Sequence, residues 1–318
     1  MLIIVLSAIS CFTAGLLQVA AGILISVIIG IMSTKYHYGY VFASASTAFL
    51  IPIIFSVFSG CNFLEGLIYA TVLSLPMILI GFILGISANL KFEFSKTIFM
   101  ASAIYLVGSL INIKVLSMAE PDFFNIQNVV SLSVNEINES IKIMYANDPE
   151  TLSYLTRIIS VAGKVLLTLS PALFIIISLA ISYVSTVLFK KINSMCGSEM
   201  NFWPSFSAML PDRVFTIIFL VIFFINGATP TGLFSDACAN VIVVLSCVFF
   251  VFGLSFIDWK FTKNGMKKWS RRILLIAITL LCMMFMLMPI FVVIAFGISD
   301  GLFGIRQRAL NKELSEGK

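Results

Sequence analysis

The stretch from Asp236 to Arg272, DACANVIVVLSCVFFVFGLSFIDWKFTKNGMKKWSRR, decides the fold class. Its middle, from Val241 to Ile257, is apolar, and about 20 apolar residues cross the ~30 Å hydrocarbon layer of a bilayer as one helix. Its end is dense in lysine and arginine, and short loops of this composition stay on the cytoplasmic side. The stretch therefore predicts one membrane crossing whose cytoplasmic end lies at 258–272.

Composition extends this interpretation to the whole chain. Of the 318 residues, 60% are hydrophobic and 11% charged, whereas soluble domains are about 25% charged. Lipid must therefore replace water around most of the polypeptide. The net charge of +5 comes from basic residues in short loops between apolar runs, so membrane topology explains it and we expect no nucleic-acid partner.

The sequence carries no recognisable catalytic or metal-binding motif. His37 is the single histidine, and no pair among the six cysteines has C-x-x-C spacing, so neither a metal site nor a disulfide frame is predicted. No phosphate-binding loop, nucleophile elbow or H-E-x-x-H pattern is present. We expect a protein that is not an enzyme and has no cofactor.

The apolar runs predict an all-α, polytopic transmembrane helix bundle of about nine spans. Residues 2–32 are long for one crossing, and we favour two short segments broken at Gly15, Gln18 and Gly22 over a single helix. The further runs are 41–59, 64–88, 98–118, 157–189, a short span to 225, 241–257 and 273–298. The bilayer is the expected surrounding.

The end of the chain leaves its sidedness open. One crossing by 273–298 would put Arg306, Arg308 and Lys312 outside, against the usual bias of basic residues. Two arms hinged at Pro289 would return the tail inside, but each would be short for a crossing. We favour the single crossing.

The chain divides into three predicted parts: an N-terminal transmembrane half (1–118), an acidic extracytoplasmic segment (119–156), and a C-terminal transmembrane half (157–318) with the basic cytoplasmic loop 258–272. Between Ile126 and Met144, apolar residues fall at three- and four-residue spacing. This spacing predicts an amphipathic helix at the membrane face, with a solvated loop as the alternative.

Charged and polar residues near the predicted outer ends are the candidate ligand-binding residues. A charge at the centre of a spanning helix is costly, so a retained one usually has a partner or a role. Pairing of Lys164 with Glu65 or Asp236 would make an outward-facing site for a small polar ligand, and side chains that snorkel to the interface are the competing interpretation. The full set is Glu65, Arg157, Lys164, Asp236 and Asn240. Other polar residues, Gln18 and Asn112 among them, are expected to make helix contacts.

Short motifs in the last third carry a family resemblance. They are Met209-Leu210-Pro211-Asp212-Arg213, Asn240 early in a span, Phe252-Gly253-Leu254 before Asp258, and the run from Gly297 to Arg306 (GISDGLFGIR). Phe252-Gly253-Leu254-Ser255 is echoed by Phe296-Gly297-Ile298-Ser299. With these motifs the chain resembles the YybS-like bacterial membrane proteins, classed as domain of unknown function 2232.

The resemblance implies a multi-pass protein of the bacterial cytoplasmic membrane. The N-terminal layout of that family is similar to substrate-capturing subunits of energy-coupling-factor transporters, which dock on a shared ATPase module. This implies binding or transport of a small solute, with an ATPase transport module as partner. The alternative is a non-transporting membrane scaffold for envelope or sporulation proteins.

Overall fold

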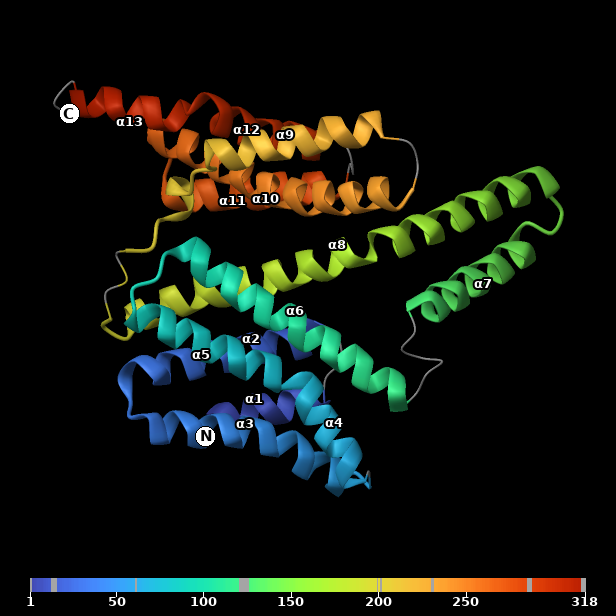
Figure 1. The fold of residues 1–318 in the computed structure, drawn as a ribbon, viewed down its shortest axis with the longest axis horizontal. Helices are drawn as coiled ribbons and strands as arrows, with labels where there is room; N and C mark the ends of the chain where they lie inside the picture. Colours follow the sequence, from blue (N-terminus) through green and yellow to red (C-terminus); the bar gives the residue numbers. More distant parts are fainter. Residues whose placement is uncertain are drawn as a thin grey trace. The chain divides into compact units, whose positions relative to one another are not determined.

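The computed structural model describes residues 2–12, 16–60, 62–119, 126–198, 200, 202–229, 232–284 and 288–315. Every regular element in these ranges is a helix (Figure 1), which confirms the predicted all-α class. The chain forms two compact units. The first comprises Met1–Ser170 and Phe174–Trp203, and the second comprises Pro171–Leu173 and Pro204–Lys318. The predicted three-part division at 118 and 157 stays a prediction.

Six helical stretches are long and apolar enough to cross a membrane, within the described residues. They are α2 (Leu16–Lys35), α3 (Tyr38–Phe58), α4 with α5 (Phe63–Leu73 and Leu75–Asn89), α6 (Phe94–Ala119), α8 (Pro149–Met195) and α10 (Leu233–Lys263). Shorter apolar helices, α9 (Arg213–Ala228) and α12 (Met288–Phe303), accompany them. The total of nine spans stays a prediction.

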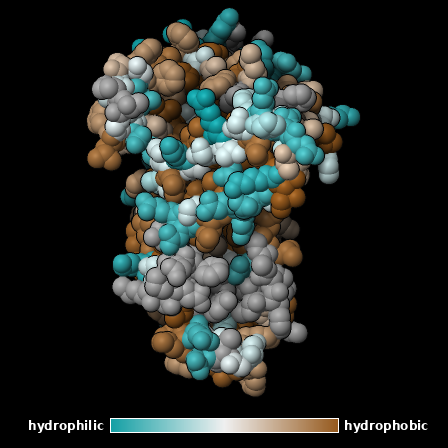
Figure 2. Space-filling model, turned by 90° about the vertical axis from the view of Figure 1, so that its right-hand side faces the viewer, coloured by the Kyte–Doolittle hydropathy of each residue, from teal (hydrophilic) through white to brown (hydrophobic). Residues whose placement is uncertain are grey.

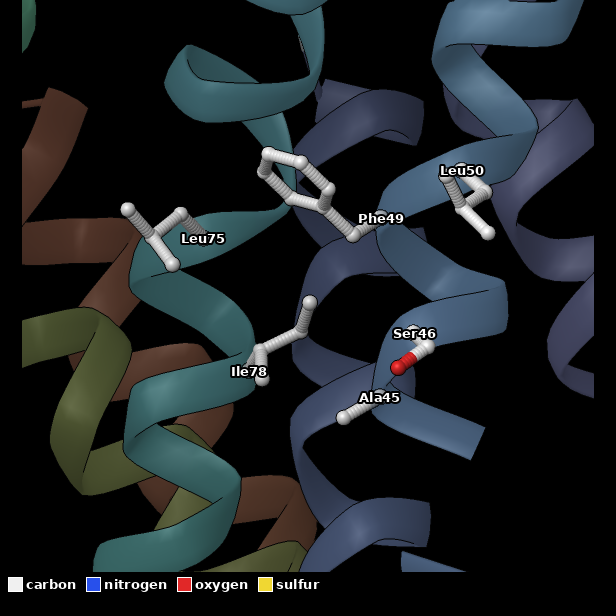
Figure 3. A pocket seen from close by; sticks show the side chains of 6 residues that line it. All are labelled: Ala45, Ser46, Phe49, Leu50, Leu75 and Ile78. Carbon is white, nitrogen blue, oxygen red and sulfur yellow. The ribbon is translucent and has the colours of Figure 1, made fainter. Parts of the chain in front are cut away.

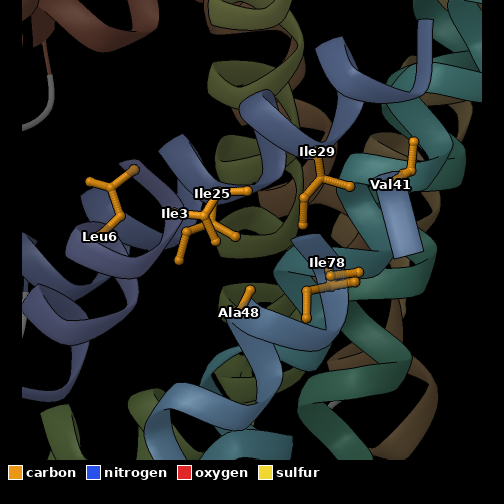
Figure 4. Close-up of a cluster of buried hydrophobic side chains, with 8 residues drawn as sticks. Ile3, Leu6, Ile25, Ile29, Val41, Ala48 and Ile78 are labelled. Atoms are coloured by element: carbon orange, nitrogen blue, oxygen red, sulfur yellow. The ribbon is translucent and has the colours of Figure 1, made fainter. Parts of the chain in front are cut away.

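The N-terminal apolar run is two helices, as we favoured. Helix α1 (Leu2–Phe12) ends before α2 begins at Leu16. Gln18 and Gly22 lie inside α2 and do not break it, and Gly15 lies outside the described residues. Aliphatic side chains from α1, α2, α3 and α5 form the core of this unit (Figure 4). They include Ile3, Leu6, Ile25, Ile29, Val41, Ala48 and Ile78.

The run 64–88 was predicted as one span, and the structure divides it at Ser74. Helix α4 ends at Leu73, and α5 begins at Leu75 with Pro76 in its first turn. Helix α5 then packs closely along α2, because a Cβ on Gly81 would lie 2.7 Å from the carbonyl oxygen of Ser26. Small residues permit this approach in membrane helix pairs. Cys61, in the turn before α4, lies outside the described residues.

The amphipathic segment is a helix with the predicted bounds, α7 (Ile126–Met144). Glu120 and Asp122, which precede this helix in the chain, lie outside the described residues. Helix α7 lies along the first half of α8 (Figure 1), and a Cβ on Gly163 would lie 2.8 Å from Val134 Cγ2. Figure 2, which views the end that carries the α7–α8 turn, shows hydrophilic side chains among hydrophobic ones.

Helix α8 starts earlier than the predicted span at 157. It runs for 47 residues from Pro149, about 70 Å at 1.5 Å per residue. Asp148 begins it, because its carboxylate accepts hydrogen bonds from the backbone N–H (3.1 Å) and hydroxyl (2.7 Å) of Thr151. These bonds lower the pKa of Asp148.

In the second unit, the predicted basic loop 258–272 is mostly helical. Helix α10 continues to Lys263 and α11 (Lys268–Met284) follows, so only 264–267 connect them. The run 273–298, favoured as a single crossing, comprises parts of two helices, because α11 ends at Met284 and α12 begins at Met288. A short tail helix, α13 (Ile305–Ser315), follows α12.

The echo between the two Phe-Gly motifs has a packing explanation. A Cβ on Gly253 of α10 would lie 1.9 Å from the carbonyl oxygen of Val293, and one on Gly297 of α12 would lie 2.4 Å from that of Phe249. Each glycine therefore admits the backbone of the opposite helix. The repeated motif marks the two sides of one close helix crossing.

Candidate functional site

The predicted outward-facing residues of the first unit do not assemble. The Glu65 carboxylate accepts from the backbone N–H of Asn62 at 3.1 Å and so caps α4. Arg157 and Lys164 are exposed on α8, and no described ion pair joins Lys164 to Glu65. Lys164 lies about 39 Å along α8 from Lys190, beyond the thickness of a ~30 Å hydrocarbon layer.

Asp236 and Asn240 lie in the second unit. Asp236 is exposed in the first turn of α10. The Asn240 side chain donates to the Asp236 carbonyl (2.8 Å) and accepts from the backbone N–H of Ala172 (2.9 Å). Pairing of Asp236 with Lys164 stays a prediction.

A cavity of about 300 Å³ lies between the helices of the first unit, at the lower end of the range for small-molecule sites. Its lining combines apolar side chains with five that can form hydrogen bonds. From α2 come Gln18, Val19, Gly22 and Ile25; from the α4–α5 break Val72, Ser74 and Met77; from α6 Tyr105, Ser109, Asn112, Ile113 and Leu116; and from α8 Phe174.

The break between α4 and α5 explains the polar character of this cavity. In an unbroken helix the carbonyl of Val72 would accept from residue 76, but Pro76 has no N–H to donate. Instead, the Asn112 amide of α6 donates to that carbonyl at 3.1 Å. Asn112 is 6% exposed, and its remaining amide donor and its oxygen have no described protein partner within the cavity. Broken helices with freed backbone groups form binding sites in many transporters.

The cavity lies in one half of the helical layer. Several basic residues of this unit, including Lys35, Lys91, Lys96 and Lys190, collect where α2, α5 and α8 end and α6 begins. Two bonds show that these ends adjoin: Asn89 to the Ser33 carbonyl (3.3 Å) and Trp203 Nε1 to the Phe92 carbonyl (2.8 Å). Gln18, Asn112 and Phe174 lie about 25 Å along their helices from this basic end. The cavity therefore lies in the half of the bundle opposite the basic end.

The lining indicates what the cavity can bind. It contains no carboxylate, amine or guanidinium group, whereas amide and hydroxyl groups alternate with aliphatic and aromatic side chains. A charged ligand would lose its hydration without gaining a counter-charge. This chemistry fits an uncharged solute with hydrogen-bonding groups.

A second hollow, between α3 and α5, is of another kind. Ala45, Ser46, Phe49, Leu50, Leu75 and Ile78 line it (Figure 3), and Ser46 supplies its one side-chain polar atom. This composition fits contact with a lipid chain better than a specific polar ligand.

The family motifs of the second unit meet at a buried ion pair. Arg306 Nε donates to Asp300 Oδ2 at 2.7 Å, and both side chains are 1% exposed. The two other guanidinium nitrogens of Arg306 donate to the Ser207 and Met209 carbonyls and to the Ser255 hydroxyl. Because each donor group of Arg306 has an acceptor, the cluster binds α10, α12 and α13 to the segment around η1 (Phe206–Ala208) and leaves no site for a ligand.

The same cluster fixes the tail. Ser255 lies near the basic end of α10, so Arg306 and the start of α13 lie at that end too. This placement of the tail fits the two-arm alternative for 273–298 and not the single crossing. The basic residues Arg213, Lys260–Arg272 and Arg306–Lys312 then share one end of this unit.

Sequence reasoning missed the cavity, although it expected Gln18 and Asn112 to make helix contacts. Asn112 does make a helix contact, its hydrogen bond to the Val72 carbonyl. The sequence feature that could have indicated the cavity is Pro76, which lies four residues after Val72 and cannot donate to that carbonyl. Among the described residues, no group of three histidine, cysteine or acidic side chains could hold a metal ion.

Residues 1–300 match the family described as "Predicted membrane protein (DUF2232)", and the chain belongs to this family. The protein is therefore a membrane protein in contact with the lipid bilayer. No curated protein and no solved structure matches the chain.

Proposed function

We propose that this member of the DUF2232 family captures a small uncharged solute in the cavity of its first unit, as a substrate-binding protein of a transport system in the bacterial cytoplasmic membrane. The observation that carries the proposal is the Asn112 amide at the proline break. It presents a donor and an acceptor to a partly open cavity of about 300 Å³. Polar backbone at membrane depth is tolerated where it lines such a cavity.

Capture without chemistry is the simplest use of this lining. A catalytic site needs a nucleophile, base or metal held against the substrate. Tyr105 is the one ionisable side chain of the cavity, and the lining holds no histidine, carboxylate or amine that could activate it or a serine hydroxyl as a nucleophile. We therefore propose that the protein is not an enzyme and uses no cofactor.

An ATPase transport module is the partner that the capture proposal calls for. Its docking side would be the basic, cytoplasmic end. The α7–α8 hairpin gives the scaffold alternative its own support. Helix α7 supplies no residue to the cavity, and its Val129, Leu132 and Ile137 are exposed. These side chains would suit contact with an envelope protein.

The test of capture is the small-molecule content of the purified protein. The wild-type chain is compared with Ser109→Leu, which fills the cavity, and with Ala103→Leu, which adds the same side chain at an exposed position of α6. We expect an uncharged compound, identified by mass spectrometry, to accompany the wild type and the Ala103→Leu control and to be lost from Ser109→Leu. Identical extracts from all three proteins would contradict capture in this cavity.

Cross-linking in membranes separates the two partner proposals. Recovery of an ATPase module supports transport. Recovery of envelope proteins alone, through cross-links placed on α7, supports the scaffold and contradicts the transport role.

A further inference from the structure

Helices α2 and α8 meet along a contact in which both faces carry small or polar residues. The facing pairs are Ser26 with Ser185, Gly30 with Phe189 and Thr34 with Asn193. Helical spacing continues these rows toward the cavity to Gly22 on α2 and to Ser182 and Ser178 on α8; all are small or polar except the aromatic Phe189. We call this contact the α2–α8 seam. Two hydrogen bonds of 3.4 Å, Ser26 to Ser185 and Thr34 to Asn193, join residues 159 positions apart. The constant offset shows that the helices run parallel and in register.

The seam is buried but not fully satisfied. Ser178 and Ser182 are 1% and 0% exposed. Ser178 donates to the carbonyl of Phe174 (2.7 Å), whereas the hydroxyl of Ser182 has no partner. Ser87 of α5 is likewise buried with an unpaired hydroxyl. Close helix packing needs only small side chains, and glycine or alanine would supply them without the cost of an orphaned hydroxyl. The hydroxyls therefore need another explanation.

One end of the seam opens from the cavity. Gly22, one turn before Ser26 on α2, lines the cavity, and Phe174, which also lines it, lies one helical turn before Ser178. The polar lining of the cavity thus continues along α8 toward the basic end of the unit.

Aromatic side chains close the seam one helical turn before its last pair, Thr34 and Asn193. Phe189 is fully buried, and a Cβ on Gly30 would lie 3.1 Å from its ring. The Phe189 ring lies 6.0 Å from that of Trp203. Two hydrogen bonds hold Trp203. Its Nε1 donates to the Phe92 carbonyl (2.8 Å), and the Lys190 ammonium donates to the Trp203 carbonyl (2.5 Å).

We propose that the α2–α8 seam is the route by which an uncharged, hydrogen-bonding solute passes from the cavity to the cytoplasmic end, and that Phe189 backed by Trp203 closes it. The identity of the solute rests on the proposed capture function, whereas the route is a property of the helix contact. The unpaired hydroxyl of Ser182 serves passing solute or water when the helices part.

Thiol reactivity tests the route without knowledge of the solute. Ser182→Cys is placed in a full-length chain whose native cysteines are replaced by serine. It is treated in membranes with methyl methanethiosulfonate, which reacts with the thiolate that forms in contact with water. The measurement is repeated with Phe189→Ala and with Phe99→Ala, a matched change at an exposed position of α6.

We expect slow modification with Phe189 present and about a tenfold increase in Phe189→Ala, as when a minor open state of about 1% becomes one of about 10%. Phe99→Ala should leave the rate at Ser182→Cys unchanged. When the thiol is placed instead at Val184, an exposed position of α8, Phe189→Ala should not change its rate of modification. Equal rates with and without Phe189 would show a dry packing contact and overturn the proposal. Equal acceleration at Val184 would show general loosening and overturn it as well.

Two further arrangements keep the test decisive. If Phe189→Ala does not fold, Phe189→Leu retains an apolar side chain and should give a smaller increase at Ser182→Cys, whereas an unchanged rate would overturn the route. The same preparations are examined for bound solute. If Phe189→Ala accelerates the modification of Ser182→Cys but no bound solute is lost in Ser109→Leu, the route is supported and capture is contradicted. If a bound solute is lost in Ser109→Leu but the modification rate does not change, capture is supported and the route is contradicted.

Discussion

Replacing Asp300 with asparagine tests the internal organisation of the second unit. Asp300→Asn keeps the size of the side chain and removes its charge, while Arg306 stays 1% exposed and charged. Breaking a buried pair by neutralising one partner costs about 3–5 kcal/mol, because the other charge is left uncompensated. The unfolding equilibrium should therefore shift by roughly two to four orders of magnitude.

A double replacement provides the opposite expectation. In Asp300→Leu with Arg306→Met, both charges leave together. Substitution of a buried pair by apolar residues of similar volume is often neutral or stabilising by about 1–4 kcal/mol. In this variant the Ser207 carbonyl loses its Arg306 donor and the Met209 carbonyl keeps only the Ser255 hydroxyl, which offsets part of the gain. We expect the double variant to be more stable than Asp300→Asn.

The assay is unfolding in increasing dodecyl sulfate, followed through the thiol of Cys282. This thiol is on α11 and 1% exposed, so it becomes reactive when the unit opens. Asp236→Asn, at an exposed position, is the matched control and should change stability by less than about 0.5 kcal/mol. A cost for Asp300→Asn as small as that of the control would refute the reasoning that this pair organises the unit.

Three further predictions concern topology, packing and pH. Cysteines at Met266 and Arg308 should both resist an impermeant thiol reagent in intact cells and react in inside-out vesicles; reaction of Arg308→Cys from outside would restore the single crossing. Gly253→Ala should destabilise the protein measurably in the same unfolding assay, because its Cβ would lie 1.9 Å from a backbone oxygen, whereas Gly227→Ala, with open space around it, should be neutral or stabilising by up to about 1 kcal/mol. Hydrogen bonds from the first turn of α8 lower the pKa of Asp148 below its ordinary value of 3.8. The stabilisation that Asp148 gives as a cap is therefore fully present above that ordinary value and is lost as the pH falls through the lower pKa of the folded state. Hydrogen exchange at the start of α8 should then rise at acid pH in the wild type, while Asp148→Ala should exchange faster at neutral pH and lose this dependence.

The sequence predicted those features whose causes are local. The bounds of α7 follow from apolar spacing between Ile126 and Met144, because a helix at an interface needs one apolar face. The two helices of residues 2–32 follow from length, since the run exceeds the thickness of a bilayer. Neither inference requires knowledge of a distant residue.

Features that depend on distant contacts were missed. The last apolar run offers Pro289 as a hinge but does not decide between one crossing and a reversal. The reversal becomes apparent through Arg306, whose acceptors lie about 50 and 100 residues earlier in the chain. The cavity is similar, because its key bond joins Asn112 to a carbonyl 40 residues away. A single sequence lists Pro76 and Asn112 as a helix breaker and a polar residue, and only the packing of α6 against the break makes them one site.

The charge distribution within each unit bears on the proposed function. Returning the tail to the basic end removes the conflict that a single last crossing created, since Arg306, Arg308 and Lys312 join the cluster from Lys260 to Arg272. For the first unit taken by itself, the positive-inside rule predicts that its basic end faces the cytoplasm. In the first unit that assignment puts the cavity in the outer half of the membrane and Phe189 near the inner surface. A solute entering at the cavity would therefore meet the closed end of the seam last, which is the order that capture from outside and release inside requires.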